Sequence, residues 1–518
     1  MASSSRLPVI GVIGAGTMGS GIALVALSAG AQVILQDTYA PVLAKADEYI
    51  KKFLEKKDKS ALYTNLTLTE SLDDFARAEV VIEAAPERLE LKQELFAKLD
   101  AVCAPEAILA TNTSTLSVTA VAATTKHPAR VAGMHFFNPA PVLPLVEVVR
   151  AAQSSPATVE ALVALAEALG KTPVVTGDTP GFIVNRVARP FYGEALRLLG
   201  ERVAGFEDID RLVEQGAGFR MGPFRLMDLI GIDINAGAMR SMYEQTYGEP
   251  RYRPHWIQMQ KLAAGELGRK TGKGFYEYKD GEKGKDEGEG MKDEGARGEG
   301  NLLISSGSFA PGLAELAVKA GFTMSHELSG QPVAAFVAAG RSQGAAAIVA
   351  AWDAALEPSV PLLVQGADIT LSEVRSWVVQ HPQRVAVFDG LFLDGALVTA
   401  SGPAELQAQV AALFASLGRR LVWVAESPAL VLPRIVCQLV NEASFAVLEG
   451  VAEGDTIDLA MKLGVNYPRG LLEWGAQLGW ERVLAVLDHL YAEYHEERYR
   501  ASVLLRRWAR NPSTDARR

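Results

Sequence analysis

Short apolar runs alternate with helical patterns over the first third of the chain. The runs are rich in Val and Ile, and stretches with apolar residues at helical spacing lie between most of them. They occupy residues 9–13, 33–35, 80–83, 108–110, 131–136 and 146–149. Strands that alternate with helices in this way form a parallel sheet with helices on both faces. The pattern therefore predicts an α/β doubly wound sheet for residues 1–180.

The pattern changes at Asp178-Thr-Pro-Gly181, beyond which the signals are mainly helical as far as about Tyr278. We therefore expect an all-α domain over residues 181–280. Residues 281–300 consist almost entirely of Gly, Glu, Lys and Asp, so they lack the apolar side chains that a core needs. This segment is predicted to be a charged, flexible linker.

The second half of the chain repeats the first half in the same order. Three blocks recur: His127-Pro-Ala-Arg-Val131 as His381-Pro-Gln-Arg-Val385, Ala26-Leu-Ser-Ala-Gly30 as Ala317-Val-Lys-Ala-Gly321, and Ile209-Asp210 with Gly222 as Ile457-Asp458 with Gly470. Blocks that recur in one order indicate an internal duplication. We therefore expect a degenerate sheet domain at residues 301–425 and a second helical domain at residues 426–518.

Composition narrows the class of protein. The 518 residues carry a net charge of −10, which argues against a nucleic-acid surface. Cys103 and Cys437 lie far apart, and no pair of Cys or His has the spacing of metal ligands. No apolar run approaches about 20 residues, and the N-terminus lacks the apolar core of a signal peptide. We therefore expect a cytoplasmic protein with no metal and no membrane span.

The strongest local motif follows the first predicted strand. Gly14-x-Gly16-x-x-Gly19 leads into a helical stretch, and Asp37 closes the second strand 18 residues after Gly19. In this context the glycines permit a tight turn, the approach of a pyrophosphate and close helix packing, while the carboxylate binds ribose hydroxyls. The motif predicts a Rossmann-type site that prefers NAD to NADP. Its expected cofactor-binding residues are Gly14, Gly16, Thr17, Met18, Gly19 and Asp37.

The corresponding segment of the second copy has lost this motif. It reads Ser305-Ser-Gly-Ser-Phe-Ala310, in which only the middle glycine survives. Side chains at the other two positions crowd a pyrophosphate. We therefore expect residues 301–425 not to bind NAD, so that a dinucleotide titration finds one site per chain.

Three polar residues stand where the predicted strands end, which is where doubly wound sheets place ligands. They are Ser114, His135 and Glu147. A histidine there serves as a general base, and a carboxylate on its far nitrogen fixes the tautomer and stabilises the imidazolium. Glu147 lies within the apolar run 145–149, so its charge needs a partner if it is buried. The residue types alone leave a catalytic His135 and a hydrogen-bonded core histidine equally open.

Six motifs together resemble the L-3-hydroxyacyl-CoA dehydrogenase family over residues 8–280. They are Gly14-Ala-Gly-Thr-Met-Gly-Ser-Gly21, Val81-Ile-Glu-Ala84, Asn112-Thr-Ser-Thr-Leu116, His135-Phe-Phe-Asn-Pro139, Asp178-Thr-Pro-Gly-Phe-Ile-Val-Asn-Arg186 and Gly268-Arg-Lys-Thr-Gly-Lys-Gly-Phe-Tyr276. The rest of the chain resembles the extended bacterial members with a second, shortened copy, which often act on 3-hydroxybutyryl-CoA or 3-hydroxyadipyl-CoA. The resemblance implies NAD-dependent oxidation of an L-3-hydroxyacyl-CoA to the 3-oxoacyl-CoA, in fatty acid β-oxidation or phenylacetate-type catabolism.

The resemblance also implies a role for each matching residue. His135 takes the proton from the 3-hydroxyl, and Glu147 orients and charge-balances His135. Ser114 and Asn185 hydrogen-bond the substrate oxygens, in a cleft between the first two domains. The positions expected to touch NAD are Glu87, Lys92, Asn138 and Lys270. For Glu87 and Lys92, which open a helix after a strand, solvated surface charges are the alternative.

The expected contacts to CoA depart from the family. The family uses a serine and a lysine on the helix after the second strand, whereas the matching stretch 51–60 has Phe53 in place of the serine. Lys56 and Lys59 are candidates for the phosphates, as is Lys57. A solvated lysine face is an equally good interpretation of this stretch.

The second copy lacks the implied catalytic residues. His135 maps onto Asp389, Ser114 onto Asp368, Asn185 onto Pro433, and Glu147 maps near Ser401. We therefore expect a second half that kept its fold and lost its reaction. Because single-copy members of the family dimerise through the helical domain, we expect the two helical domains to form an internal pseudo-dimer, with a homodimer of chains as a further option.

Two other functions remain open from the sequence. One is a different NAD-dependent β-hydroxyacid dehydrogenase whose substrate is not a CoA ester. The other is a non-catalytic NAD-binding structural protein. The complete set of Ser114, His135, Glu147 and Asn185 argues against the latter, because a chain released from catalysis tends to lose such residues, as the second half has.

Overall fold

The computed structural model describes residues 6–278, 299–305, 312–328, 330–338, 344–378 and 380–511. Residues 281–298 of the predicted linker and residues 306–310 of the degenerate glycine segment lie outside the described residues. The chain divides into two compact units. The first comprises Met1–Val187 with Ala446–Asn466, and the second comprises Ala188–Phe445 with Tyr467–Ala516.

The first unit is built on an eight-stranded sheet of order β3-β2-β1-β4-β5-β6-β7-β8. Its strands are β1 (Ile10–Ile13), β2 (Val33–Gln36), β3 (Leu66–Thr69), β4 (Val80–Glu83), β5 (Ile108–Thr111), β6 (Val131–Phe136), β7 (Leu145–Arg150) and β8 (Thr172–Gly177). The six predicted strands are present, and β3 and β8 are added at the two edges. These edge strands carry Thr, Pro and half-buried positions, so their apolar signal is weak.

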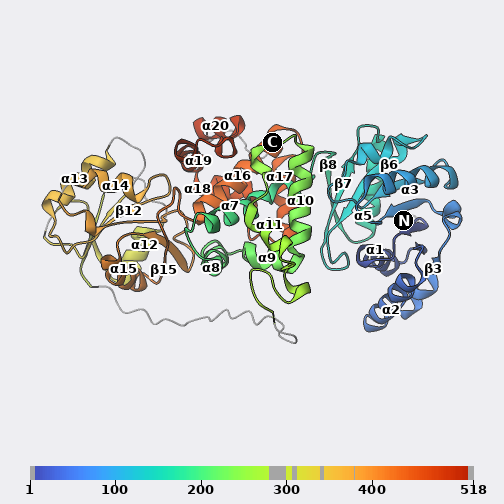
Figure 1. Cartoon of the computed structure of the whole chain (residues 1–518), viewed down its shortest axis with the longest axis horizontal. Helices are drawn as coiled ribbons and strands as arrows, with labels where there is room; N and C mark the ends of the chain where they lie inside the picture. The colour runs from blue at the N-terminus through green and yellow to red at the C-terminus, as the bar shows by residue number, and fades with distance from the viewer. Residues whose placement is uncertain are drawn as a thin grey trace, which may run out of the picture. The chain divides into compact units, whose positions relative to one another are not determined.

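Helices cover both faces of this sheet, as Figure 1 shows. They are α1 (Thr17–Ser28), α2 (Ala40–Lys56), α3 (Leu89–Val102), α4 (Val118–Ala122) and α5 (Pro156–Ala168), followed by the short α6 (Val184–Val187). One core cluster joins α1, α2 and α5 to the sheet through residues such as Leu24, Ile50 and Leu162. A second cluster joins α3 and α4 through Phe96 and Val121. The predicted doubly wound α/β fold is therefore confirmed.

The prediction of an entirely parallel sheet is wrong at β7. The register of β6 and β7 is antiparallel, with His135 opposite Glu147. The connection between the two strands spans only residues 137–144, whereas a parallel crossover needs a dozen or more residues and usually a helix. The chain therefore turns back directly, and this turn brings the histidine and the glutamate to neighbouring positions.

Two similar sets of helices follow the two sheets. The first set is α7 (Arg189–Gly200), α8 (Phe206–Ala217), α9 (Pro223–Ile230), α10 (Ile232–Gln245) and α11 (Trp256–Ala263). The second is α16 (Leu432–Leu448), α17 (Gly454–Val465), α18 (Leu471–Leu478), α19 (Trp480–Tyr494) and α20 (Val503–Arg510). The bounds of α17 and α18 lie 248 residues after those of α8 and α9. The predicted duplication of the helical region is therefore confirmed.

The second sheet repeats the first with one strand fewer. Its order is β10-β9-β11-β12-β13-β14-β15. The strands are β9 (Asn301–Ile304), β10 (Thr323–Ser325), β11 (Ala334–Val337), β12 (Leu362–Gln365), β13 (Val385–Phe388), β14 (Leu397–Ser401) and β15 (Arg420–Trp423), and the helices are α12 (Leu313–Ala320), α13 (Ala345–Ala355), α14 (Leu371–Trp377) and α15 (Ala404–Ser416). As in the first sheet, one pair is antiparallel, here β13 with β14.

Short 3-10 helices complete the described structure. They are Ser60–Asn65, Asp73–Arg77, Pro128–Arg130, Pro250–Tyr252, Arg269–Thr271, Pro382–Arg384 and Glu497–Tyr499. The turns at Pro128–Arg130 and Pro382–Arg384 belong to the recurring His-Pro-x-Arg-Val block. In both copies the arginine is buried and pairs with an aspartate, at 2.9 Å for Arg130 with Asp100 and 2.9 Å for Arg384 with Asp353. The block therefore recurs for a structural reason.

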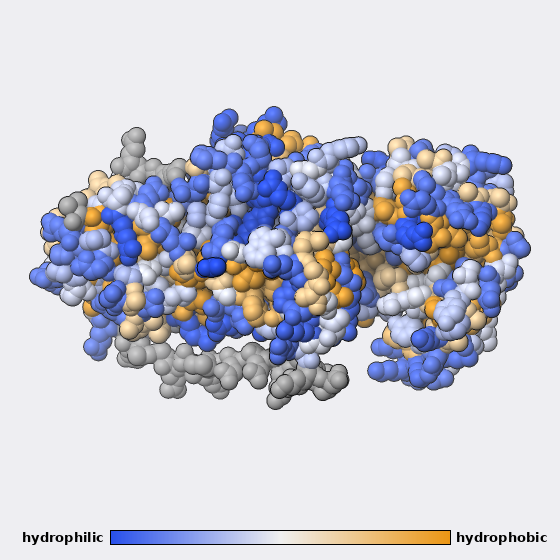
Figure 2. Space-filling model, viewed as in Figure 1, coloured by the Kyte–Doolittle hydropathy of each residue, from blue (hydrophilic) through white to orange (hydrophobic). Residues whose placement is uncertain are grey.

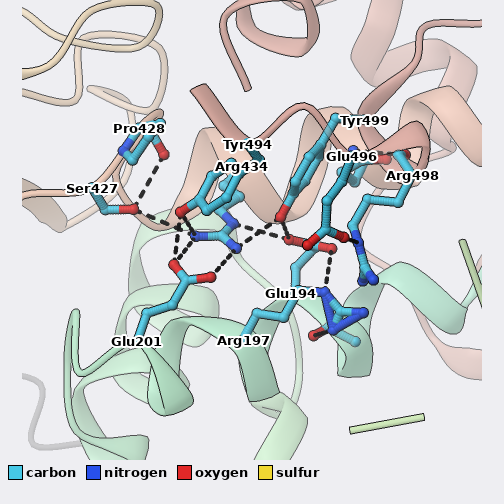
Figure 3. Close-up of polar contacts among 12 residues, drawn as sticks. Glu194, Arg197, Glu201, Ser427, Pro428, Arg434, Tyr494, Glu496, Arg498 and Tyr499 are labelled. Carbon is cyan, nitrogen blue, oxygen red and sulfur yellow. Dashed lines mark hydrogen bonds and ion pairs between the residues drawn. The ribbon is translucent and has the colours of Figure 1, made fainter. Parts of the chain in front are cut away.

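Within the second unit, α7 of the first helical set contacts α16 of the second set. The fully buried Arg434 on α16 donates hydrogen bonds to Glu194 of α7 at 2.9 Å and to Glu201, the residue that follows α7, at 2.7 and 2.9 Å (Figure 3). The hydroxyls of Tyr494 and Tyr499 accept from the same guanidinium at 2.9 and 2.8 Å. Side chains of the two helical copies thus meet in one hydrogen-bonded network.

The surface in Figure 2 has hydrophilic and hydrophobic residues interspersed in both units. Over the described part of the chain, no helix is both long enough and apolar enough to cross a membrane. Tyr247 and Val142 are among the most exposed large apolar side chains, at 100% and 70% exposure. Single exposed apolar residues of this kind are normal for a globular protein.

Candidate active site

The glycine motif forms a tight turn between β1 and α1. Gly14 has a φ of +87°, and a Cβ atom there meets the carbonyl oxygen of Ala84 at 2.8 Å. A Cβ on Gly19 meets the carbonyl oxygen of Gly14 at 1.7 Å. Both positions therefore require glycine, the first because of its backbone conformation and the second because the helix packs directly on the turn.

Gly16 is a glycine for a different reason. It is the residue before α1, and a Cβ there meets no atom of the protein within 4 Å. The first turn, which includes Thr17 and Met18, contains no acidic residue, and Gly16 provides no side-chain cap for its N–H groups. Asp37, at the end of β2, accepts a hydrogen bond from the N–H of Ala15 at 2.9 Å. This open helix N-terminus beside a carboxylate fits the pyrophosphate and ribose of NAD.

The open space at Gly16 leads to a test. Replacing Gly16 by Val is expected to weaken NAD binding at least about tenfold, because the side chain occupies the path of the pyrophosphate and blocks charge-assisted hydrogen bonds. The unfolding midpoint stays unchanged, since no protein atom is displaced. NAD titration by calorimetry checks this, with Gly237→Val as the control, because Gly237 also faces open space. Unchanged affinity in Gly16→Val contradicts the assignment.

His135 and Glu147 form a buried pair at the end of β6. The Nδ1 atom of His135 lies 2.7 Å from Oε2 of Glu147. The two side chains are 5% and 0% exposed. The rings of Phe137 and Phe182 flank the imidazole, with centroid separations of 4.6 and 5.9 Å. Since Nδ1 is engaged by the carboxylate, Nε2 is the nitrogen available to a substrate.

The carboxylate of Glu147 has partners on both oxygens. Oε1 accepts the N–H groups of Ile183 and Val184, both at 3.0 Å, where the chain enters α6. A buried charge requires such partners, and hydrogen bonds to an ionised oxygen are about twice as strong as neutral ones. The pair is thus held by β7 on one side and by the 182–187 segment on the other. The expectation that a buried Glu147 has a partner is met.

Ser114 and Asn185 lie together in the first unit, although 71 positions separate them. The Nδ2 atom of Asn185 is 3.5 Å from the carbonyl oxygen of Ser114, and both side chains are half-buried. Ser114 follows β5, the strand next to β6, and Asn185 directly follows the two residues that hold Glu147. The four predicted catalytic residues therefore come from three neighbouring strands, β5, β6 and β7, and from the short helix α6.

Glu87 and Lys92 belong to a polar network beneath the β4 and β5 ends. Glu87 accepts hydrogen bonds from Thr113 Oγ1 and from the N–H groups of Ser114 and Thr115 at 2.5, 2.9 and 3.1 Å. Burial opposes its ionisation, but Lys92 and these donors outweigh burial and lower the pKa of Glu87 below its ordinary value.

Lys92 is 1% exposed, so it is not a solvated surface charge. Its Nζ lies 2.7 Å from Glu83, 3.4 Å from Glu87 and 3.2 Å from the carbonyl oxygen of Ala85. The sequence analysis did not single out Glu83 as a site residue. The sequence indicates Glu83 only as a glutamate at the end of a continuous apolar strand, where a buried carboxylate requires a polar partner.

The remaining predicted contacts are exposed or have other partners. Asn138 is exposed just after β6. Lys270 lies in the second unit, where it pairs with both oxygens of Asp233 at 2.6 Å. Lys56 is exposed, and Lys59 donates to the carbonyl oxygen of Ser28 at the end of α1 at 2.9 Å. The roles of these residues towards NAD and CoA stay predictions.

Among the described residues of the second sheet, the positions that correspond to His135 and Glu147 hold no histidine and no glutamate. The N–H of Asp389 donates to the carbonyl oxygen of Thr399 at 2.8 Å, so Thr399 stands where Glu147 stands in the first copy. The position predicted near Ser401 is therefore Thr399, two residues earlier. Asp389 is fully buried and accepts from the N–H of Leu391 at 2.9 Å, and burial raises its pKa to about 7. Asp389 therefore faces a threonine in place of the glutamate, and the imidazole–carboxylate pair of the first copy is not formed at these positions.

Comparison with known proteins identifies the family. The model of the 3-hydroxyacyl-CoA dehydrogenase NAD-binding domain matches residues 9–179. The model of the C-terminal domain of the same family matches twice, at residues 181–278 and 430–516. The chain therefore belongs to the 3-hydroxyacyl-CoA dehydrogenase family, an enzyme family that uses NAD.

Individual relatives agree with this placement. The 3-hydroxyadipyl-CoA dehydrogenase of Escherichia coli (strain K12) is 38% identical over 517 residues, which covers 97% of this chain and 98% of that protein. The mitochondrial hydroxyacyl-coenzyme A dehydrogenase of Homo sapiens is 40% identical over 295 residues, covering 54% of this chain and 94% of its own length. The crystal structure of 3-hydroxybutyryl-CoA dehydrogenase from Escherichia coli K12 covers 98% of both chains with a TM-score of 0.79 and 37% identity.

Proposed function

We propose that this chain oxidises the 3-hydroxyl group of an L-3-hydroxyacyl-CoA thioester, with His135 as the general base and Glu147 as its partner. The observation that carries the proposal is the buried contact of 2.7 Å between Nδ1 of His135 and Oε2 of Glu147 at a strand end of the NAD-binding sheet. Such a pair is costly to bury, and apolar side chains of similar volume at the same positions often stabilise a fold as well or better.

The arrangement supports a separate role for each of these groups. Bound NAD supplies the acceptor for the hydride that leaves C3. Nε2 of His135 takes the proton of the 3-hydroxyl, because Nδ1 is already directed at Glu147. The carboxylate then stabilises the imidazolium, and the N–H groups of Ile183 and Val184 keep the carboxylate in place. No covalent bond between the protein and the substrate is required.

Ser114 and Asn185 complete the proposed substrate site. A hydroxyl and a carboxamide supply both donors and acceptors for the 3-oxygen and the thioester oxygen. Their contact through the Ser114 carbonyl oxygen supports a shared role.

We assign the activity to the cytoplasm, and the two buried, unpaired cysteines support this assignment. The domain boundaries 1–180, 181–280, 301–425 and 426–518 are also part of the proposal.

Two relatives that match nearly the whole chain carry names for two different esters. The test is therefore NADH formation with a panel of 3-hydroxyacyl-CoA esters that includes the butyryl, adipyl and longer-chain forms, alongside the matching free acids. We expect turnover of at least one ester and none of its free acid. Equal turnover of a free acid favours a dehydrogenase for a non-CoA substrate. Binding of NAD without turnover of any ester favours a structural protein.

A further inference from the structure

An ion pair of the first unit joins the two copies of the helical domain. Arg186, next to Asn185, is 5% exposed and donates to Oε2 of Glu449 at 2.6 Å. Glu449 belongs to the second copy, at the end of α16. The equivalent pair in the second unit is Arg434 with Glu201, at 2.7 and 2.9 Å. Arg434 and Glu449 lie 248 residues after Arg186 and Glu201, the offset of the duplicated helices.

A backbone hydrogen bond between the two copies is also present twice, once in each unit. The N–H of Gly177, at the end of β8, donates to the carbonyl oxygen of Val451 at 3.2 Å. Its counterpart is the N–H of Ala425, which donates to the carbonyl oxygen of Val203 at 2.9 Å. These positions are again separated by 248 residues. Each sheet is therefore fastened to the segment that follows the long helix of the other copy.

Helix α17 also packs against the first sheet. It belongs to the second copy, yet Ala446–Asn466 forms part of the first compact unit. A Cβ on Gly464 meets Leu145 Cδ2 at 2.7 Å, Val184 Cγ2 at 3.2 Å and Phe137 Cε1 at 3.6 Å. In the second unit, a Cβ on Gly216 of α8 meets Leu432 Cδ1 at 2.6 Å and the carbonyl oxygen of Leu397 at 3.0 Å.

The residues that Gly464 touches are those that hold the catalytic pair. The N–H of Val184 donates to Glu147, Leu145 begins the strand that carries Glu147, and Phe137 flanks the imidazole of His135. Arg186 and Gly177 stand on either side of the 178–185 loop and are tied to the same segment of the second copy. A displacement of that segment is therefore transmitted to both oxygens of Glu147.

We propose that Ala446–Asn466 of the second copy is a positioning element of the active site, with Gly464 and Glu449 as its positioning residues. This inference rests on the proposed function of His135 and Glu147. It gives the second half of the chain a purpose although its own sheet lacks the catalytic residues: the second copy must fold in order to deliver this segment to the first sheet. The equivalent helix of the first copy, α8, packs on the second sheet, which lacks the counterparts of His135 and Glu147.

The matched pair Gly464→Ala and Gly216→Ala tests the proposal. Both glycines lie one residue before the end of equivalent helices, and each added methyl group meets a buried leucine at 2.6–2.7 Å. Gly464→Ala is expected to lower kcat about tenfold, since small misplacements of catalytic groups carry costs of this order. KM for NAD stays within about twofold, and the midpoint of the kcat–pH profile shifts because the contact between His135 and Glu147 changes. Gly216→Ala keeps both kcat and the profile.

Two results overturn the proposal. One is a folded Gly464→Ala variant with the kcat and pH profile of the parent chain. The other is an equal loss of kcat in both variants with an unshifted profile, which indicates general destabilisation. If Gly464→Ala does not fold, Glu449→Gln decides, because Glu449 is 43% exposed and the carboxamide oxygen of Gln still accepts a hydrogen bond from the buried Arg186 after the negative charge is lost. That variant is expected to lower kcat about threefold with the same shift of the profile, and an unchanged kcat rejects the proposal.

Failure of this inference is distinguishable from failure of the proposed function. If the parent chain turns over no ester, or if its turnover survives loss of the His135 imidazole, the function itself is wrong. If the parent chain is active and depends on His135 while both Gly464→Ala and Glu449→Gln behave like the parent, only the positioning role is wrong.

Discussion

Replacing His135 by Gln is expected to lower kcat by about three orders of magnitude, within the range that a general base contributes. The amide of Gln is similar in reach but accepts no proton at working pH. KM for NAD is expected to stay unchanged, because the glycine turn and Asp37 lie at the ends of other strands. Steady-state NADH formation with the best ester of the panel measures the effect.

The control for this variant is His127→Gln. His127 is also a histidine beside a carboxylate, with Nδ1 3.1 Å from Oδ1 of Asp100, but its side chain is 55% exposed in a turn. We expect the kcat of His127→Gln to match that of the parent chain. An active His135→Gln variant, with kcat within about tenfold of the parent, rejects the proposed role of the imidazole.

Replacing Arg434 by Met is expected to lower the free energy of unfolding of the second unit by about 3–5 kcal/mol, the usual cost of removing one partner from a buried ion pair. The guanidinium is 0% exposed and is shared by Glu194, Glu201, Tyr494 and Tyr499 (Figure 3). Burial opposes its charge, but the surrounding acids and tyrosines outweigh burial and keep the pKa of Arg434 above its ordinary value. Without it, Glu201 loses two hydrogen bonds and Glu194 is left, as an ion pair, with the longer contact of 3.8 Å to Arg197.

Urea unfolding, followed by tryptophan fluorescence, measures this effect. Lys52→Met is the control, because Lys52 pairs with Glu48 at 2.6 Å but both side chains are largely exposed. Exposed pairs of this kind contribute little, so no measurable change is expected there. An Arg434→Met variant as stable as the parent chain shows that the network is not what joins the two helical sets.

Most of the fold was predictable because its signals are local. The buried strands β1, β2, β4, β5 and β6 are short apolar runs, and the turn glycines are set by backbone conformation at Gly14 and by close packing at Gly19. The edge strand β3 escaped prediction because its four residues, two of them Thr, are all only half-buried, which leaves a weak apolar pattern. The duplicated helices were recognisable because packing residues such as Asp210 and Asp458 survived the loss of chemistry.

The sequence by itself determined the doubly wound α/β fold, the NAD turn, the duplication and the identity of the four candidate catalytic residues, because each depends on residue type and spacing along the chain. Only the tertiary structure decided how those residues meet. The short 137–144 connection turns β7 back, which sets Glu147 opposite His135. Burial in the fold makes Lys92 an internal partner of Glu83 rather than a surface charge. The placement of Ala446–Asn466 in the first unit depends on contacts between residues more than 260 positions apart, which no local pattern records.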